Sequence, residues 1–419
     1  MTEQSSPDAA WLDALAHATL QLGRVLLVNG ADTEQVQVLV TRFAASFGAD
    51  ANLLVTYEAV LVTLAVGGRI RTKLGYRVPG MGVGMSSIEA INRLVTDAGS
   101  GRLHVDDIQS SLDTIEHRPP VYPRWLIAVA LGITAASLSR LFGGDLLACI
   151  AAGLAGSVGT WVRLELGRHH VNPILVAFVV ALLSGIVGGV AVDFSRTATP
   201  ALTLIAPAMI LVPGVPLING ILDMIRNHVT VGVSRLSFAS LVVLAIAFGV
   251  FCATRLTGIG IPVDSPTATI SVPQDALFSA LAAGGFALLF NVPARMAWAC
   301  AVCGVASHTL RTLLFHLGID LIAGTLVGAL VVGMLAQAFA RRFQAPAVAL
   351  AFPGVVAMVP GAYAFRAVFG TLQIADATAS TATVAETLSL SATVGLMIGA
   401  IAVGIAAPAL LFPPRQSAR

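Results

Sequence analysis

Ten apolar segments, each close to the length needed to cross a bilayer, follow one another between residues 125 and 411. Such a segment crosses lipid as a helix, because the hydrocarbon offers its backbone no hydrogen-bond partner. Hydrophobic residues make up 56% of the chain and charged residues only 11%, unlike soluble proteins. We therefore expect an α-helical polytopic membrane protein with about ten transmembrane helices, at residues 125–141, 145–163, 172–192, 201–222, 236–256, 275–292, 296–315, 318–339, 346–368 and 387–411.

Residues 1–118 have a different pattern, with charged faces and no apolar run of span length. The helical period predicts a helix from Trp11 to Val28 that ends at Gly30. A second helix is predicted to start at Asp32, with Gln35 completing a capping box. Three β-rich runs follow, and a glycine pair typical of a hairpin turn joins the last two. We expect these strands at residues 53–57, 60–66 and 69–78.

Two further capping boxes, Ser86 with Glu89 and Asp106 with Gln109, predict two more helices in this region. The order α-α-β-β-β-α-α indicates a small α+β domain over residues 1–118, joined to the membrane part by a proline-containing linker at 119–124. Residues 1–7 are polar and unlike a signal peptide, so we expect this domain to lie in the cytoplasm.

The distribution of arginines predicts the orientation of the spans, because short cytoplasmic loops are rich in basic residues. With residues 1–118 inside, eleven arginines of the linker, the loops and the C-terminus fall on the cytoplasmic side and five on the other. Both termini are then cytoplasmic. Five spans in each half, over residues 125–260 and 270–412, would give the two halves opposite orientations, which is the inverted-repeat arrangement of many secondary transporters.

Two proline-glycine pairs, Pro213-Gly214 and Pro360-Gly361, interrupt apolar segments in the two halves. Proline removes a backbone donor and glycine loosens the chain, so a helix is expected to break there. Lipid cannot satisfy the backbone groups that are released, and such breaks occur where they line a cavity. We therefore predict a substrate site between two broken helices, with these four residues at its centre.

The run from Val212 to Asp223, Val-Pro-Gly-Val-Pro-Leu-Ile-Asn-Gly-Ile-Leu-Asp, resembles the threonine/serine exporter family. Further matches to the family are Gly30-Ala31-Asp32-Thr33, Asn172-Pro173, and Phe352-Pro353-Gly354 ahead of the second break. The resemblance covers nearly the whole chain. Relatives of the two halves also occur as separate proteins that form a succinate exporter pair, so the chain is similar to a fused form. One departure is that the second half lacks the Asn-Gly-x-x-Asp sequence that follows the first break.

The resemblance implies export of threonine and serine across the bacterial inner membrane, driven by the proton motive force. A dicarboxylate exporter remains the alternative, since the sequence does not show the substrate. The partners expected are therefore a small-molecule substrate, protons and the lipid bilayer, and self-association into a homo-oligomer stays open.

Alignment of the two breaks places Asn219 opposite Arg366, which suits a substrate carboxylate or zwitterion. Arginine can hold a carboxylate through two parallel hydrogen bonds, and asparagine can donate or accept. Tyr363, one turn before Arg366, is a third candidate for the cavity wall. The alternatives are that Arg366 extends from a helix end toward the membrane surface and that Tyr363 only packs.

Three titratable residues are candidates for proton coupling: Asp223, His308 and Glu386. A partly desolvated acid can load and release protons, and histidine has an unperturbed pKa near 6.5. Asp223 could instead pair with Arg226, and Glu386 could be an interfacial residue at a helix end. His308 lies on the same helix face as Arg311, and both are expected to point into the bundle, where His308 could instead be a hydrogen-bonded packing residue.

Other functional classes receive little support. No P-loop, H-E-x-x-H motif or nucleotide-binding glycine fingerprint is present, so we predict no enzyme activity, cofactor or metal. Cys300-x-x-Cys303 lies in an apolar span and is interpreted as packing. Eight basic residues precede Arg118, against thirteen carboxylates, which argues against nucleic-acid binding. A hydrolase or ligand-sensing domain at residues 1–118 that controls the membrane part is the remaining alternative.

Overall fold

A computed structural model describes residues 9–76, 82–103, 105–263, 270–343, 345–376 and 379–411. The chain divides into two compact units, which we treat separately. The first comprises Met1–Val121, Asn219–Leu236 and Gln344–Pro346; the second comprises Tyr122–Ile218, Ser237–Phe343 and Ala347–Arg419. The short stretch around residues 219–236, predicted to belong to the membrane part, therefore clusters with the amino-terminal region.

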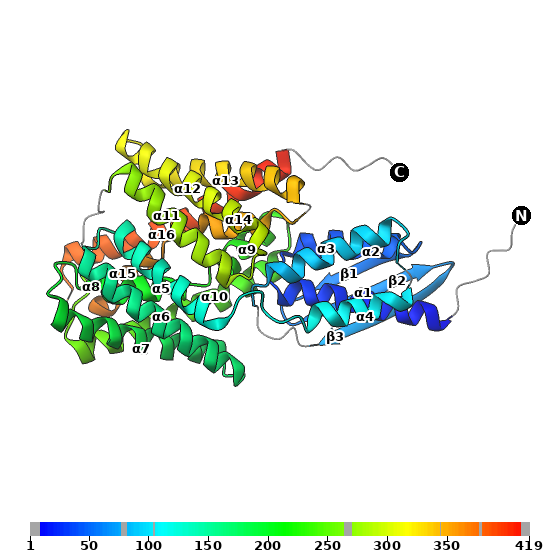
Figure 1. Ribbon diagram of the computed structural model, residues 1–419, viewed down its shortest axis with the longest axis horizontal. Coiled ribbons are helices and arrows are strands. Elements are labelled where there is room, and N and C mark those ends of the chain that lie inside the picture. The colour runs from blue at the N-terminus through cyan, green and yellow to red at the C-terminus, as the bar shows by residue number, and fades with distance from the viewer. Residues whose placement is uncertain are drawn as a thin grey trace, which may run out of the picture. The chain divides into compact units, whose positions relative to one another are not determined.

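The amino-terminal region contains a three-stranded antiparallel sheet with four helices (Figure 1). Strand order is β1-β2-β3, and both pairs are formed by neighbouring strands. Gly67 and Gly68 have φ values of 55° and 78°, as the predicted hairpin turn requires. The elements are α1 (Ala9–Val28), α2 (Thr33–Ala45), β1 (Asp50–Val55), β2 (Ala59–Val66), β3 (Arg69–Tyr76), α3 (Met85–Gly99) and α4 (Val105–Glu116). Residues 77 and 78 of the third predicted strand lie outside the described residues.

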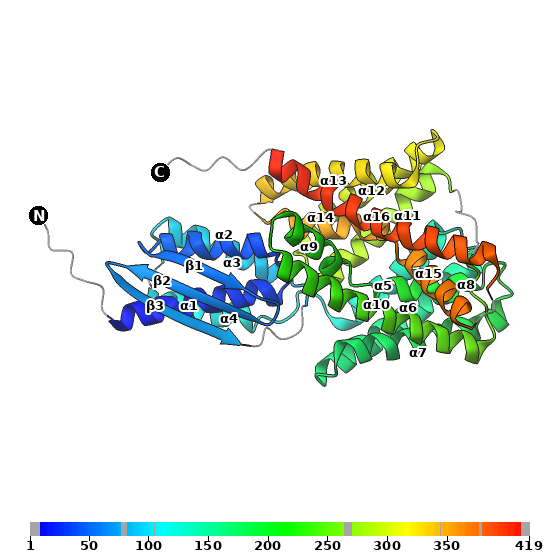
Figure 2. The same ribbon diagram turned by 180° about the vertical axis from the view of Figure 1, so that it is seen from behind.

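The core of this region lies between the sheet and α1 (Figure 2). Val60, Val62 and Leu64 alternate along β2 and are fully buried, which is the two-residue period of a strand with one covered face. Helix α1 packs against β2 and β3, and α2 packs against β1. At the edge of the sheet, Asp13 of α1 accepts hydrogen bonds from Lys73 and Arg71 of β3, which hold the pKa of its carboxyl below the usual value.

The predicted capping boxes are only partly correct. Asp32 caps α2, with Oδ1 accepting from Gln35 N at 2.9 Å, but the buried Oε1 of Gln35 has no hydrogen-bond partner. The capping box predicted with Ser86 as the N-cap is wrong, because α3 begins at Met85 and its N-cap is Gly84. A Cβ at Gly84 would lie 2.0 Å from Asn29 Oδ1, so close packing sets this helix start. Helix α4 begins at Val105, ahead of the predicted cap Asp106.

Within the described residues, eight helices are long and apolar enough to cross a membrane, or ten if each of two bent pairs counts as one span. This confirms a polytopic helical membrane protein; the inverted repeat remains a prediction. The helices are α5 (Arg124–Leu141), α6 (Leu146–Arg168), α7 (Pro173–Ser195), α10 (Val229–Thr257), α11 (Val272–Leu289), α12 (Ala294–His316), α13 (Leu321–Phe343) and α16 (Thr381–Leu411). The bent pairs are α8 (Ala201–Met209) with α9 (Gly214–Ile225), and α14 (Val348–Val355) and η1 (Val356–Met358) with α15 (Gly361–Ala375).

Both bends occur at the predicted proline-glycine pairs, with angles of 54° and 49°. Their backbone hydrogen bonds match. Gly214 N donates to Val212 O and Gly361 N to Val359 O, each at 2.8 Å. Pro213 O then accepts from Leu217 N, and Pro360 O from Ala364 N, so each proline carbonyl opens the next helix. The two breaks thus share one local geometry.

Close helix packing in the second unit depends on particular glycines. A Cβ added to Gly188 of α7 would lie 2.2 Å from the backbone oxygen of Thr203, which cannot rotate away. We predict that Gly188→Ala destabilises the protein by about 1–3 kcal/mol through this overlap. The measurement is the midpoint of thermal unfolding in detergent.

The matched control is Gly284→Ala on α11, where nothing lies within 4 Å of the added methyl group. Alanine favours the helix by up to about 1 kcal/mol over glycine, so this variant should be as stable as the parent protein or more so. Equal midpoints for the two variants would contradict the packing described for α7 and α8.

Candidate functional site

The two breaks meet inside the second unit. Val212 and Gly214 from the first break and Val359 and Gly361 from the second line one narrow cavity. A Cβ built on Gly361 would lie 3.3 Å from Val212 Cγ2, and one built on Gly214 would lie 3.6 Å from Val359 Cγ2. Glycine at both positions therefore lets the two broken helices approach closely. The cavity here has a volume of only about 10 Å³, close to that of a single water.

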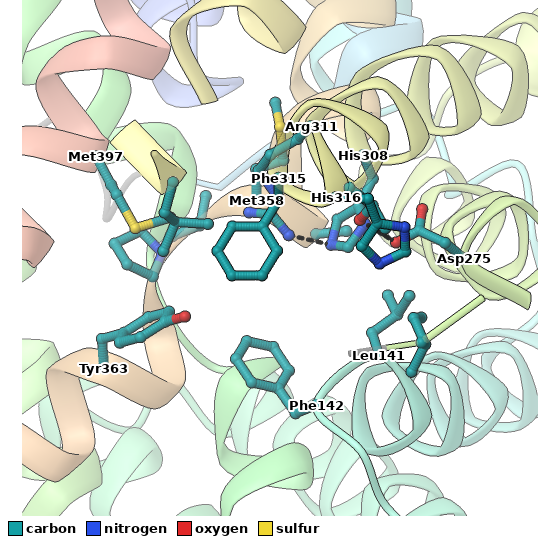
Figure 3. A pocket seen from close by; sticks show the side chains of 16 residues that line it. Leu141, Phe142, Asp275, His308, Arg311, Phe315, His316, Met358, Tyr363 and Met397 are labelled. Atoms are coloured by element: carbon teal, nitrogen blue, oxygen red, sulfur yellow. Dashed lines mark hydrogen bonds and ion pairs between the residues drawn. The ribbon is translucent and has the colours of Figure 1, made fainter. Parts of the chain in front are cut away.

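A larger cavity of about 60 Å³ lies beside the second break (Figure 3). Val359 and Pro360 line it, together with Tyr363 from the first turn of α15. Aromatic rings form part of its wall, with Phe142 and Tyr363 in a T-shaped pair at 6.2 Å. The remaining polar wall comes from α11 and α12 and consists of Asp275, His308, Arg311, Thr312 and His316.

Helical spacing explains why α12 presents these groups together. Positions 308, 311, 312, 315 and 316 recur at intervals of three and four residues, so they lie on one face. Figure 3 shows His308, Arg311, Phe315 and His316 projecting from that helix toward the cavity. A lipid-facing position would be costly for Arg311 and His308, and a position inside the bundle avoids this cost for both side chains.

Asp275, at the start of α11, is the centre of the polar wall. Its side chain is fully buried and accepts three hydrogen bonds. Oδ2 accepts from His308 Nδ1 at 2.8 Å and from Thr312 Oγ1 at 2.6 Å, and Oδ1 accepts from Thr309 Oγ1 at 3.1 Å. A buried carboxylate needs partners of this kind, because its desolvation is otherwise prohibitive.

His308 bridges the carboxylate of Asp275 and the guanidinium of Arg311. Its Nδ1 faces Asp275, and its Nε2 contacts Arg311 Nη2. A guanidinium can only donate, so these contacts fit a neutral imidazole with the proton on Nδ1 and an acceptor at Nε2. The cavity wall therefore holds an anion, a titratable ring and a cation in sequence. This arrangement can bind a ligand that carries both charges and can exchange a proton.

Of the other predicted substrate residues on α15, Arg366 has its partners outside this cavity and Tyr363 lines it. Arg366 does not line it, because its Nε donates to Val263 O at 3.0 Å and its Nη2 lies 3.9 Å from Glu386 Oε1. Glu386 is 41% exposed, as expected for a residue at a helix end. Tyr363, one turn before Arg366, does line the cavity.

Asn219 and Asp223 contact the amino-terminal region. Asn219 Nδ2 donates to Gly30 O at 2.9 Å, and Asp223 Oδ1 accepts from Thr33 N at 3.0 Å. Of the two alternatives for Asp223, the pairing with Arg226 is not formed, because Asp223 pairs with Arg235 at 3.2 Å; proton coupling remains a prediction. Asn219 and Arg366 thus have separate partners, and their joint role in substrate binding remains a prediction.

Sequence reasoning missed Asp275 and Arg235. Asp275 lies 33 positions before His308, and no periodic pattern links them. A usable signal was present on α12, where His308, Thr309, Arg311 and Thr312 interrupt an apolar span within five positions. Such a cluster must find partners in the bundle, which makes an acid on a neighbouring span the natural place to look.

Sequence comparisons were made with known proteins. The family described as "Putative threonine/serine exporter" matches residues 17–257, and "Threonine/Serine exporter, ThrE" matches residues 275–411. A "Probable threonine/serine exporter" of Mycobacterium tuberculosis is 25% identical over 374 residues, covering 84% of this chain and 69% of the relative. A "Probable succinate transporter subunit YjjP" of Escherichia coli is 28% identical over 251 residues, covering 59% of this chain and 96% of the relative. No solved structure matches significantly.

Removal of the Asp275 charge tests the polar wall. We predict that Asp275→Asn lowers the free energy of unfolding by at least about 2 kcal/mol, because an amide cannot replace a carboxylate that accepts three buried hydrogen bonds. The measurement is the midpoint of thermal unfolding in detergent.

Asp320→Asn is the matched control, since Asp320 Oδ1 accepts from Ile322 N and Ala323 N at the start of α13 and asparagine caps equally well. Its stability should stay within about 0.5 kcal/mol of the parent protein. A similar small effect at Asp275 would show that its three hydrogen bonds are not formed.

Proposed function

The chain belongs to the threonine/serine exporter family, and on that premise we propose that it exports small amino acids, threonine and serine above all, through the cavity of α11, α12 and α15. We place it in the bacterial inner membrane with both termini in the cytoplasm and the proton motive force as its energy source. The observation that carries the proposal is the row of Asp275, His308 and Arg311 on the cavity wall, which places an anion, a titratable ring and a cation side by side.

These charges complement an amino acid. The Arg311 guanidinium can hold the substrate carboxylate through two parallel hydrogen bonds, as planar guanidinium groups do. The Asp275 carboxylate faces the same cavity and supplies the negative charge that a substrate ammonium group requires. Thr312 and Tyr363 place hydroxyl groups on the wall, which can contact the hydroxyl of threonine or serine.

Proton coupling in this proposal centres on His308. Its Nε2 has one lone pair, which either takes a proton or accepts the hydrogen bond from Arg311. Protonation of the ring would bring two like charges into contact, and Arg311 would have to turn away. The charge on His308 is therefore linked to the position of the group that would hold the substrate. Asp223 and Glu386, the other predicted proton carriers, do not line this cavity.

The cavity must change shape during transport. Its volume of about 60 Å³ is well below the roughly 300–1,000 Å³ of usual ligand sites. Val359 and Pro360 line it and also form the bend between η1 and α15. A change of the bend angle would therefore change the width of the cavity directly, which gives the break a mechanical role in alternating access.

Dicarboxylate export is the second candidate. It is favoured by the E. coli relative, whose name describes a probable succinate transporter subunit, and by His316 on the same wall. An N–H of His316, on the same cavity wall as Arg311, could donate to a second carboxylate. The two candidates differ in the substrate charges that the site must neutralise: an ammonium and a carboxylate for an amino acid, and two carboxylates for a dicarboxylate.

Efflux from preloaded cells tests this proposal. We predict that cells containing the protein release labelled threonine and serine faster than cells without it, and that an uncoupler abolishes the difference. Arg311→Gln should reduce threonine efflux at least about 100-fold, because a buried bidentate contact worth roughly 3 kcal/mol is lost. Arg311→Lys should recover part of the loss through its charge.

Arg366→Gln is the comparison variant, since Arg366 bonds to a backbone carbonyl outside the cavity. Its efflux should exceed that of Arg311→Gln by at least tenfold. The reverse order would move the substrate carboxylate to Arg366, and release of succinate alone would favour the dicarboxylate exporter.

A further inference from the structure

The turn between α1 and α2 is held by side chains from α9, from the turn that follows α9 and from the first two turns of α10. Every residue of the turn, from Gly30 to Thr33, is contacted. We call the set of interacting residues the clasp. It consists of Gly30, Ala31, Asp32 and Thr33 from the turn, and of Asn219, Asp223, Arg226 and Arg235.

The clasp combines backbone hydrogen bonds with ion pairs. Besides the contacts of Asn219 and Asp223 described above, Arg235 Nη2 donates to Ala31 O at 3.0 Å. Arg226 Nη1 donates to Asp32 Oδ1 at 2.9 Å. Two carboxylates thus meet two guanidinium groups, and the charges balance.

The clasp is buried. Asn219, Asp223 and Arg235 are each at most 1% exposed, and Asp32 is 4% exposed. The surroundings also affect Tyr57, where burial raises the pKa to about 12 although the charge of Arg235 opposes that shift. Charges are seldom buried to this extent without a specific partner.

The clasp is also incompletely satisfied. Within the part of the chain that the structure describes, Asn219 Oδ1 and Arg235 Nη1 are buried without a hydrogen-bond partner. Each such group loses its hydration without compensation, so a partly satisfied polar network gives little net stability. Water would satisfy both atoms if the clasp opened. A network with such unpaired atoms is better suited to a contact that opens and closes than to a permanent interface.

Helix α9 connects the clasp to the first break. It begins at Gly214, directly after Pro213, and its 12 residues span about 18 Å. Asn219, Asp223 and Arg226 follow one another at intervals of four and three residues and so share one face. The start of α10 packs closely on the end of α9, because a Cβ on Gly232 would lie 2.6 Å from Gly220 O. The end of α9 and the start of α10 therefore form one stiff hairpin.

We propose that the clasp positions α9, and with it the break at Pro213, so that the amino-terminal region controls the movement of the broken helix during transport. Asp32, Asp223, Arg226 and Arg235 are then positioning residues that do not touch the substrate. This inference rests on the proposed function. It assigns the amino-terminal region a mechanical part in the transport cycle.

The test is a double-mutant cycle on threonine transport by purified protein in proteoliposomes. Asp32→Asn removes the charge but keeps an oxygen that can cap α2, and Arg226→Gln removes the other charge. We expect each variant to lower the maximal rate at least tenfold in protein that remains folded at the assay temperature, with the KM for threonine close to that of the parent protein. The double variant should be no slower than either single variant, because the contact is already lost.

Asp13→Asn is the matched control, since it removes an ion pair with Arg71 and Lys73 in the same unit but outside the clasp. It should transport at the parental rate. Asn219→Ala is an independent clasp variant that deletes only the hydrogen bond to Gly30 O, and it should also lower the maximal rate.

Parental rates in Asp32→Asn, Arg226→Gln and Asn219→Ala would overturn the proposal, as would a raised KM with an unchanged maximal rate. A loss of rate accompanied by unfolding in every clasp variant would equally overturn it, because the contact would then be only structural. If the parent protein does not transport threonine at all, the proposed function is contradicted. If the parent protein and the clasp variants transport threonine equally well, only the proposed role of the clasp is contradicted.

Discussion

Lipid provides no hydrogen-bond partner, and this constraint governs where the chain departs from a continuous helix. Each proline-glycine break is placed so that protein atoms satisfy or cover the backbone it releases. At both breaks the glycine N–H bonds to a carbonyl two residues earlier, and the proline carbonyl starts the following helix. The two breaks pack against each other, so the irregular backbone of one is shielded by the other. The cavity lined by Asp275, His308 and Arg311 lies directly beside the second break.

Burial away from water imposes a related constraint on the two buried charge clusters. In the cavity wall, Asp275 and Arg311 have opposite charges and are joined through His308. In the clasp, two carboxylates face two guanidinium groups. Because the charges balance, both clusters can be buried. Neither adds much to the stability of the fold, however, because the cost of desolvating the charges offsets most of their attraction. Charged clusters retained at such positions are better explained by function than by stability, and here one suits ligand binding and the other suits movement.

Much of this architecture could be predicted because it depends on local sequence. Apolar length located the spans, although α10 begins at Val229 and α16 at Thr381, ahead of the predicted 236 and 387, and proline chemistry located both breaks. Glycine pairs located the hairpin turn, whereas the Ser86 box failed because tertiary packing at Gly84 set the helix start. Partners distant in sequence could not be predicted. Asp223 meets Arg235 instead of Arg226, and Arg366 meets the Val263 carbonyl, because helix packing decides these pairs and no local pattern reports it.

The most direct test of the account asks whether threonine occupies the cavity of α11, α12 and α15. A cysteine introduced as His316→Cys would lie on the cavity wall, and its rate of modification by a small maleimide can be measured with and without threonine. The account predicts that threonine slows the modification of a variant that still exports it. An unchanged rate in such a variant, at threonine concentrations that saturate export, would contradict the assignment of the substrate site.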